Sequence, residues 1–121
     1  LFWTYDSEGR GKDITVNKNR SDEFGWTYEY DDDNLVTGLT DDNSAVFSVT
    51  RDANIGWITG TSLGDVSDAT TRTLFGEVAE YGAEFDDDNL LNIKYCRDRA
   101  GRITDKCETV LTDTATTYSY T

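Results

Sequence analysis

One stretch shows best how this chain is built: Tyr95-Cys96-Arg97-Asp98-Arg99-Ala100-Gly101-Arg102-Ile103. It has the form of an aromatic strand, an aspartate, a short polar turn and a returning strand. The Asp98 carboxylate is of a type that accepts hydrogen bonds from backbone N–H groups at a turn entry. Gly101 supplies the positive φ that a short hairpin needs. The stretch therefore predicts a β-hairpin.

The same sequence motif recurs, with substitutions, along the whole chain. Its aligned aspartates fall at 6, 31, 52, 86 and 98, and a sixth copy begins at Tyr118-Ser119-Tyr120-Thr121, where the aspartate is lost. The intervals of 25, 21, 34 and 12 residues are irregular, so we expect a hairpin unit with connections of variable length. The chain is thus predicted to form one domain, residues 1–121, of about five degenerate repeats.

The shared spacing of the copies assigns local structure to individual residues. Period-two aromatics point to one face of a strand. We expect strands at Tyr28, Tyr30, Phe47, Phe85, Tyr95, Tyr118 and Tyr120. We expect Asp31, Asp52, Asp86 and Asp98 at or just before turns.

The composition favours an all-β protein. Fifteen aromatic residues and eighteen threonines stand beside ten glycines and no proline, a mixture suited to half-buried pleated surfaces and turns. No segment predicts a convincing helix; Leu74–Tyr81 contains Gly76 and is expected to be a loop that leads into a strand.

Charge excludes several classes of function. The chain carries 11 basic and 24 acidic side chains, a net charge of −13, whereas a protein that binds duplex nucleic acid needs a basic surface. No apolar run is long enough for a membrane helix, and the first residues have no basic region of a signal peptide, so a soluble, processed or excised piece is expected. Histidine, the commonest general base, is absent. A pair of carboxylates could hydrolyse a glycosidic bond without histidine, but nothing in the sequence marks one Glu as buried beside an aromatic residue, the condition that raises its pKa. We therefore expect no enzymatic activity, and no cofactor unless the acidic runs bind calcium.

The phrase Tyr-x-Tyr-Asp-x-x-Gly-Arg resembles the YD repeat of the RHS and YD-repeat proteins. It is clearest from Tyr95 to Thr104, and the linking segments Leu35–Gly38, Trp57–Gly64 and Phe75–Ala79 are similar to those between such repeats. Glycine and arginine of the motif occur together only at Gly9-Arg10 and Gly101-Arg102. The resemblance covers essentially the whole chain, although individual copies are eroded.

The resemblance implies an all-β fold of stacked antiparallel β-hairpins in a curved or spiralling sheet, the wall of a shell or tube. In that family the shell encloses a toxic segment of bacterial secreted toxins, or forms an adhesion stalk at the cell surface. The expected function is an extracellular or secreted scaffold, and the expected partners are further repeats, in the same chain or by end-to-end association into a filament. The family's self-cleavage motif includes a proline, which this chain lacks.

Two acidic runs and three tryptophans are the candidate binding residues. The acidic runs are residues 31–34 and 86–89, each with the sequence Asp-Asp-Asp-Asn. Their clustered side-chain oxygens suit calcium, but hairpin turns also favour Asp and Asn when no metal is bound. The calcium candidates are Asp31, Asp33, Asn34, Asp86, Asp88 and Asn89. Trp3, Trp26 and Trp57 are candidates for stacking on glycans in an adhesion module, or for packing within the wall.

The two cysteines are expected to be free thiols or to contact neighbouring strands, without a disulfide within their hairpin. If the turn is centred on Arg99-Ala100, Cys96 lies opposite Ile103 and Cys107 lies opposite Asn92. That offset of four residues is about 13 Å along a strand, beyond the ~7 Å that a disulfide spans between Cα atoms.

Overall fold

The computed structural model describes residues 1–17, 19–21, 23–111 and 113–120. These residues form eleven β-strands and no helix, which confirms the all-β prediction. The strands are β1 (Phe2–Tyr5), β2 (Gly11–Val16), β3 (Phe24–Tyr30), β4 (Val36–Asp41), β5 (Val46–Arg51), β6 (Ile58–Leu63), β7 (Val66–Arg72), β8 (Val78–Phe85), β9 (Asp88–Arg97), β10 (Ile103–Val110) and β11 (Thr116–Ser119).

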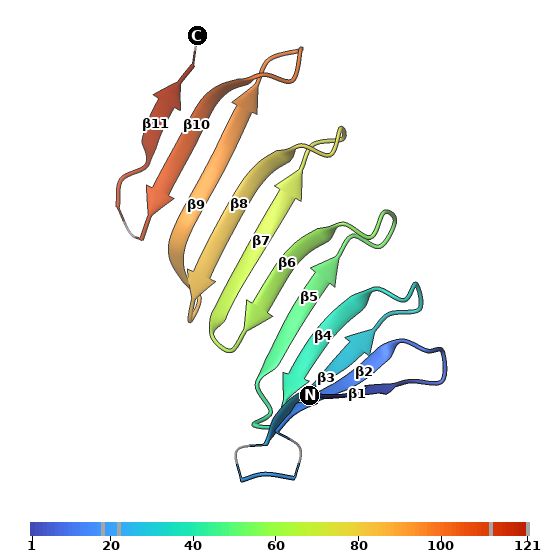
Figure 1. Ribbon diagram of the computed structural model, residues 1–121. Helices are drawn as coiled ribbons and strands as arrows, with labels where there is room; N and C mark the ends of the chain where they lie inside the picture. Colours follow the sequence, from blue (N-terminus) through green and yellow to red (C-terminus); the bar gives the residue numbers. More distant parts are fainter. Residues whose placement is uncertain (18, 22, 112, 121) are drawn as a thin grey trace.

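All eleven strands belong to one open antiparallel sheet whose spatial order is the sequence order, β1 to β11. Figure 1 shows a single twisted layer, with β1 and β11 at opposite ends and connections alternating between two edges. Within the part of the chain described, each strand contacts only its immediate neighbours. The fold is therefore a stack of hairpins, as the repeat predicts.

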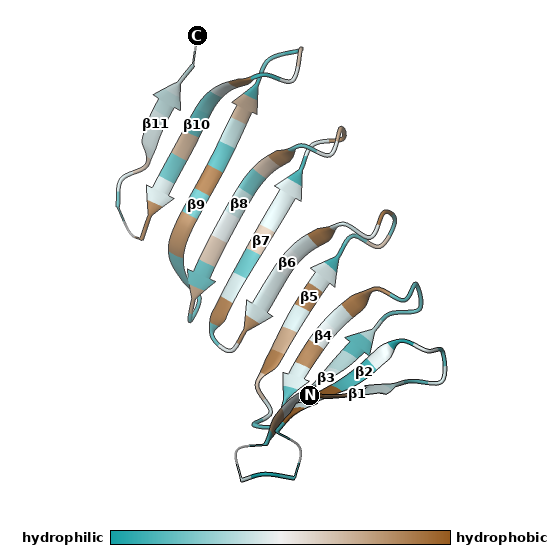
Figure 2. Ribbon diagram, viewed as in Figure 1, coloured by the Kyte–Doolittle hydropathy of each residue, from teal (hydrophilic) through white to brown (hydrophobic). Residues whose placement is uncertain are grey.

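Strand pairing assigns the side chains to two unlike faces, because directly paired residues lie on the same side of a sheet. One face, here called the aromatic face, begins with Trp3 paired to Ile14 and Ile14 to Trp26. It continues through Phe47, Leu63, Val66 and Phe85, each paired to the next. The brown segments in Figure 2 mark hydrophobic residues along the strands.

The opposite face, here called the polar face, consists mainly of Thr, Ser, Gly and charged residues. On it Asp13 accepts hydrogen bonds from the hydroxyls of Thr4 and Thr27 at 2.6 and 2.8 Å. Farther along, the Asn92 amide donates to Glu80 at 2.9 Å. Short polar ladders of this kind suit a surface that water reaches.

The sheet has no second layer, and no hydrophobic side chain of the described residues is buried. The buried positions among those residues are three glycines, Gly25, Gly38 and Gly60. Large apolar side chains remain substantially exposed, including Leu63 at 52% and Phe85 at 50%. Stability must come from contacts between neighbouring hairpins, because there is no enclosed core.

The local predictions are confirmed with one correction. The predicted aromatics lie in strands except Tyr120, which follows the end of β11 at Ser119. Its backbone N–H still donates to the Thr104 carbonyl at 2.7 Å, so pairing extends slightly beyond the regular strand. Asp31, Asp52, Asp86 and Asp98 all lie at or just before turns. Thr121 lies outside the described residues.

The predicted register around the cysteines is wrong. Cys96 pairs with Asp105 and Cys107 with Lys94, because the pairing shifts by one residue between Ile103 and Asp105 and the turn is centred differently. The two cysteines are thus offset by two residues and share the polar face. Both are free thiols, which is one of the two arrangements expected.

No helix of the described residues has the length and apolar character needed to cross a membrane.

Candidate functional site: the Asp-loop edge and the aromatic face

Five loops of related structure lie along one edge of the sheet, here called the Asp-loop edge. They connect each odd strand to the following even strand and cover residues 6–10, 31–35, 52–57, 73–77 and 98–102. Figure 1 shows all five loops along the same edge of the sheet.

The loop of residues 98–102 illustrates the shared hydrogen bonds. The Asp98 N–H donates to the Arg102 carbonyl at 2.9 Å, and the Gly101 N–H donates to the Asp98 carbonyl at 3.0 Å. The Asp98 carboxylate accepts from the N–H groups of Ala100 and Arg102 at 2.8 and 3.0 Å. Gly101 has φ +80°, which explains why glycine is favoured there.

The other loops reproduce this pattern with substitutions. Asp6 and Asp31 each accept two backbone N–H bonds in the same way. In the fourth loop Thr73 stands in the aspartate's place, and its hydroxyl accepts from the Phe75 N–H at 3.2 Å. Each of the five loops contains one residue of positive φ, and these residues are Gly9, Asn34, Gly56, Gly76 and Gly101.

The structural alignment corrects the sequence repeat. Asp86 lies on the opposite edge, in a two-residue turn with Asp87, whereas Thr73 is the true equivalent of the aspartates. The loop positions 6, 31, 52, 73 and 98 are then 25, 21, 21 and 25 residues apart, far more regular than predicted. Asp86 and Asp87 both have positive φ, as type I′ turns require, and such turns also select Asp.

A second repeated feature is a one-residue bulge just after each loop. The register shifts at the start of every even strand that leaves the Asp-loop edge, in the pairs β1–β2, β3–β4, β5–β6, β7–β8 and β9–β10. Such bulges increase local twist. Their recurrence gives each hairpin the same shape, so that one hairpin fits against the next.

Neighbouring hairpins are joined at this edge by the residue that precedes three of the five loops. The Tyr30 hydroxyl donates to the Gly11 carbonyl of the previous hairpin at 2.6 Å. At the equivalent position Arg51 donates to the Val36 carbonyl at 3.1 Å, and Arg97 donates to the Val78 carbonyl at 3.2 Å. Three different hairpins thus make the same lateral contact.

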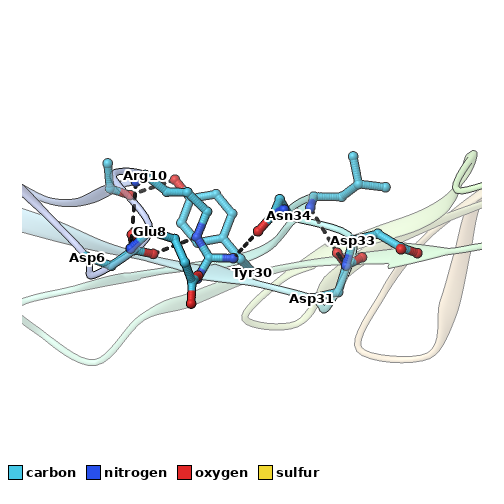
Figure 3. Close-up of polar contacts among 9 residues, drawn as sticks. Asp6, Glu8, Arg10, Tyr30, Asp31, Asp33 and Asn34 are labelled. Carbon is cyan, nitrogen blue, oxygen red and sulfur yellow. Dashed lines mark hydrogen bonds and ion pairs between the residues drawn. The ribbon is translucent and has the colours of Figure 1, made fainter.

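Loop residues add further contacts between hairpins. Arg10 stacks on Tyr30 at 4.6 Å from the ring centre and donates to the Asn34 side chain at 2.5 Å, as Figure 3 shows. Trp57 lies against Gly76 so closely that a Cβ there would be 2.2 Å from the indole. The Arg72 guanidinium lies 5.4 Å from the Trp57 ring centre.

Electrostatic effects strengthen two of the loops. Hydrogen bonds from the Arg102 side chain and backbone hold the pKa of Asp98 below its ordinary value. At Asp6 desolvation acts in the opposite direction, but hydrogen bonds from the Arg10 side chain and backbone outweigh it and the pKa is again lowered. The carboxylates therefore stay ionised as turn acceptors.

Hollows recur between adjacent loops. A cavity of about 590 Å³ lies between the 73–77 and 98–102 loops, lined in part by Leu74, Phe75, Glu77 and Arg97. A second, of about 500 Å³, lies between the 31–35 and 52–57 loops, and Arg51 lines it at the position equivalent to Arg97. They are spaces between stacked repeats, and both are open to solvent.

The calcium candidates do not form equivalent sites. Asp31, Asp33 and Asn34 belong to the Asp-loop edge, where Asp31 is occupied by the N–H groups of Asp33 and Leu35. The second run lies at the opposite edge, with Asp86 in the turn and Asp88 and Asn89 in β9. Within the described ranges, no three His, Cys, Asp or Glu side chains are grouped so as to hold a metal.

The candidate tryptophans fall in two places. Trp3 and Trp26 lie on the aromatic face on either side of Ile14 and are 48% and 36% exposed. Trp57 belongs to the Asp-loop edge, where it packs against Gly76 and Arg72. The structure therefore brings together two of the three.

No protein-family model and no curated protein matches this chain.

Proposed function

We propose that this chain is a structural scaffold of the YD-repeat type, a wall segment of an extracellular or secreted shell, tube or filament. The observation that carries the proposal is the lateral lock, in which Tyr30, Arg51 and Arg97 each bind the preceding hairpin through its backbone carbonyl. Side chains of the Asp-loop edge are used here to hold repeat against repeat.

The energetics of such a sheet suit a scaffold. In repeat proteins stability is approximately a sum of unit terms and nearest-neighbour terms, so length can grow without a larger core. The described chain has no buried hydrophobic side chain, and its strands contact only their neighbours. The shape of the sheet, and not a single pocket, is the property that this architecture can supply.

The expected partners are further repeats that extend the sheet at its outer strands. β1 and β11 each have one neighbour among the described strands, and unpaired strand edges are templates for another strand. Because the order is antiparallel and eleven is odd, β1 and β11 run in the same direction. Copies joined head to tail would pair these strands in parallel, whereas a further repeat within one chain would continue the antiparallel ladder.

Deletion of one complete repeat tests the proposal. Removing Asp52–Arg72 joins Arg51 directly to Thr73. Arg51 already precedes a loop of the Asp-loop edge, and Thr73 already begins one. We expect the shortened protein to retain its β-sheet circular dichroism per residue and a cooperative melt. A scaffold tolerates the loss of a unit, because the remaining hairpins keep their strand direction and faces.

The matched control removes only the β5 segment, Val46–Arg51, so that β4 is followed directly by β6. This variant should lose cooperative melting, since the strand directions no longer alternate. If the whole-repeat deletion unfolds as completely as the control, the units are not interchangeable and the scaffold proposal fails.

Adhesion is a second candidate function, favoured by the exposure of Trp3 and Trp26 on one face. Planar aromatic side chains at such positions suit stacking on sugar rings. A glycan array on the full chain tests it, with the double variant Trp3→Ala, Trp26→Ala as the control. Specific glycan binding that this variant abolishes would support adhesion, and an array without signal would remove it.

A further inference from the structure

The two faces of the sheet differ in charge as well as in hydrophobicity. At the paired positions of the aromatic face there are four basic and four acidic residues, so that face has no net charge. The eight are Arg51, Arg72, Arg97, Lys106, Asp41, Asp68, Asp88 and Glu108. The paired positions of the polar face carry Asp13, Glu29, Glu80, Glu84 and Asp105 against Lys94 alone. The acidic excess of the chain thus lies away from the aromatic face.

The aromatic face also has the relief of a packing surface. Phe47, Leu63, Val66 and Phe85 form a continuous row across β5 to β8, and the last three are about half exposed. Hollows of about 220 and 300 Å³ flank Phe47 on this face. Projecting apolar side chains beside hollows of that size are what two interdigitating sheets present to each other.

The available area is sufficient for a stable complex. Eleven strands spaced about 4.8 Å apart, each about six residues long at ~3.3 Å per residue, give a face on the order of 1,000 Å². A standard interface buries about 800 Å² on each partner.

The charges on the aromatic face are arranged so that the face complements itself. Arg51, Arg72 and Arg97 end their strands at the Asp-loop edge. Asp41 and Asp88 lie at the opposite ends of their strands. If a second sheet is laid face to face with its strands reversed, the edge that carries the three arginines in each copy faces the edge that carries Asp41 and Asp88 in the other.

We propose that the aromatic face is buried against the aromatic face of a second copy of this chain, in a two-fold dimer that forms a β-sandwich. This inference goes beyond the scaffold proposal, because it concerns the face of the sheet and not the strand edges. It predicts that a chain with net charge −13 associates through a face whose basic and acidic residues balance.

Sedimentation velocity of the full chain at micromolar concentrations tests the dimer. The informative variant is Leu63→Gln, Val66→Gln, which changes two paired residues of the aromatic face without adding charge. Its matched control is Ser62→Gln, Ser67→Gln, a pair in the same two strands that faces the other way. We expect a dimer for the unaltered chain and the control, and a dissociation constant at least about tenfold higher for the informative variant.

Several outcomes would overturn the proposal. They are a monomeric unaltered chain at every concentration tested, equal dissociation of both variants, or a dimer that neither variant weakens. In the last case association occurs elsewhere, and strand-edge pairing can be identified with Thr117→Pro in β11. Circular dichroism of both variants should match that of the unaltered chain, because Leu63 and Val66 are exposed in the single sheet.

Discussion

The two edges of the sheet differ in how regular their connections are. At the Asp-loop edge the loops have five residues, or six in the 52–57 loop, and similar hydrogen bonds. At the opposite edge the connections are residues 17–23, 42–45, 64–65, 86–87 and 111–115, whose lengths range from two to seven residues. The two connections of equal length still differ in conformation, because both Asp86 and Asp87 have positive φ whereas only Gly64 does in the 64–65 turn. Regularity is thus concentrated where hairpins lock onto one another, and the other edge is free to vary.

One connection at the variable edge shows what the aspartate itself specifies. Asp41 accepts from the N–H groups of Asn43 and Ala45 at 2.9 and 2.8 Å, which is the pattern of the Asp-loop edge. The aspartate therefore specifies a turn, whereas the lateral contacts of Tyr30, Arg51 and Arg97 specify the edge.

The largest effect that distinguishes the edges is expected from Gly76→Ala. Gly76 has φ +84°, and an added Cβ would lie 2.2 Å from the Trp57 ring, so the variant combines backbone strain with displacement of the indole. We expect a loss of about 2–4 kcal/mol of unfolding free energy by urea denaturation.

Gly64→Ala is the matched control at the variable edge. Gly64 has φ +57° but no atom within 4 Å of an added Cβ, so only the backbone strain remains. That strain is about 1 kcal/mol. Equal losses at Gly76 and Gly64 would mean that the lateral contact of Trp57 contributes nothing.

The sequence predicts the strands and most turns, because period-two aromatics and Asp-x-x-Gly turns are local signals. It assigns Asp86 to the wrong edge and overlooks Thr73, since a threonine hydroxyl can replace the carboxylate as acceptor. The regular spacing of Arg51, Arg72 and Arg97, at 21 and 25 residues, is the signal that would have found the fourth loop.

The cysteine register and the partners of the arginines could not be predicted in the same way. The bulge after each loop adds one residue to the even strand, and residue type marks that position only in part. The extra residue is a threonine in three hairpins, Thr37, Thr59 and Thr104, but Lys12 or Ala79 in the other two. The lateral locks join residues such as Arg51 and Val36, whose contact depends on that bulge.

A smaller effect is expected at the acidic run of the Asp-loop edge. Asp31→Ala removes the acceptor of the Asp33 and Leu35 N–H groups and should cost about 1–2 kcal/mol in urea denaturation. Asp32→Ala, at the exposed tip of the same loop, should cost almost nothing. A melting temperature that falls in EDTA and recovers with calcium would instead assign the run to a metal site.

The smallest effect should appear in the pH dependence of the 98–102 loop. Arg102 lowers the pKa of Asp98 in the folded state, so this pair stabilises the fold above the unfolded-state pKa of Asp98, near 3.8. That contribution is lost as the pH falls through the still lower folded-state pKa. Arg102→Gln should therefore melt at a slightly lower temperature than the unaltered chain at neutral pH, and the difference should vanish in acid.

Arg99→Gln is the control for this titration, because Arg99 lies in the same loop but does not bind the Asp98 carboxylate. Its melting temperature should differ from that of the unaltered chain by the same small amount at every pH. If the Arg102→Gln difference also persists unchanged below the folded-state pKa of Asp98, Arg102 acts through packing. The 98–102 loop would then be held by its backbone bonds to Asp98, as the 31–35 loop is held by Asp31 without an arginine at the position of Arg102.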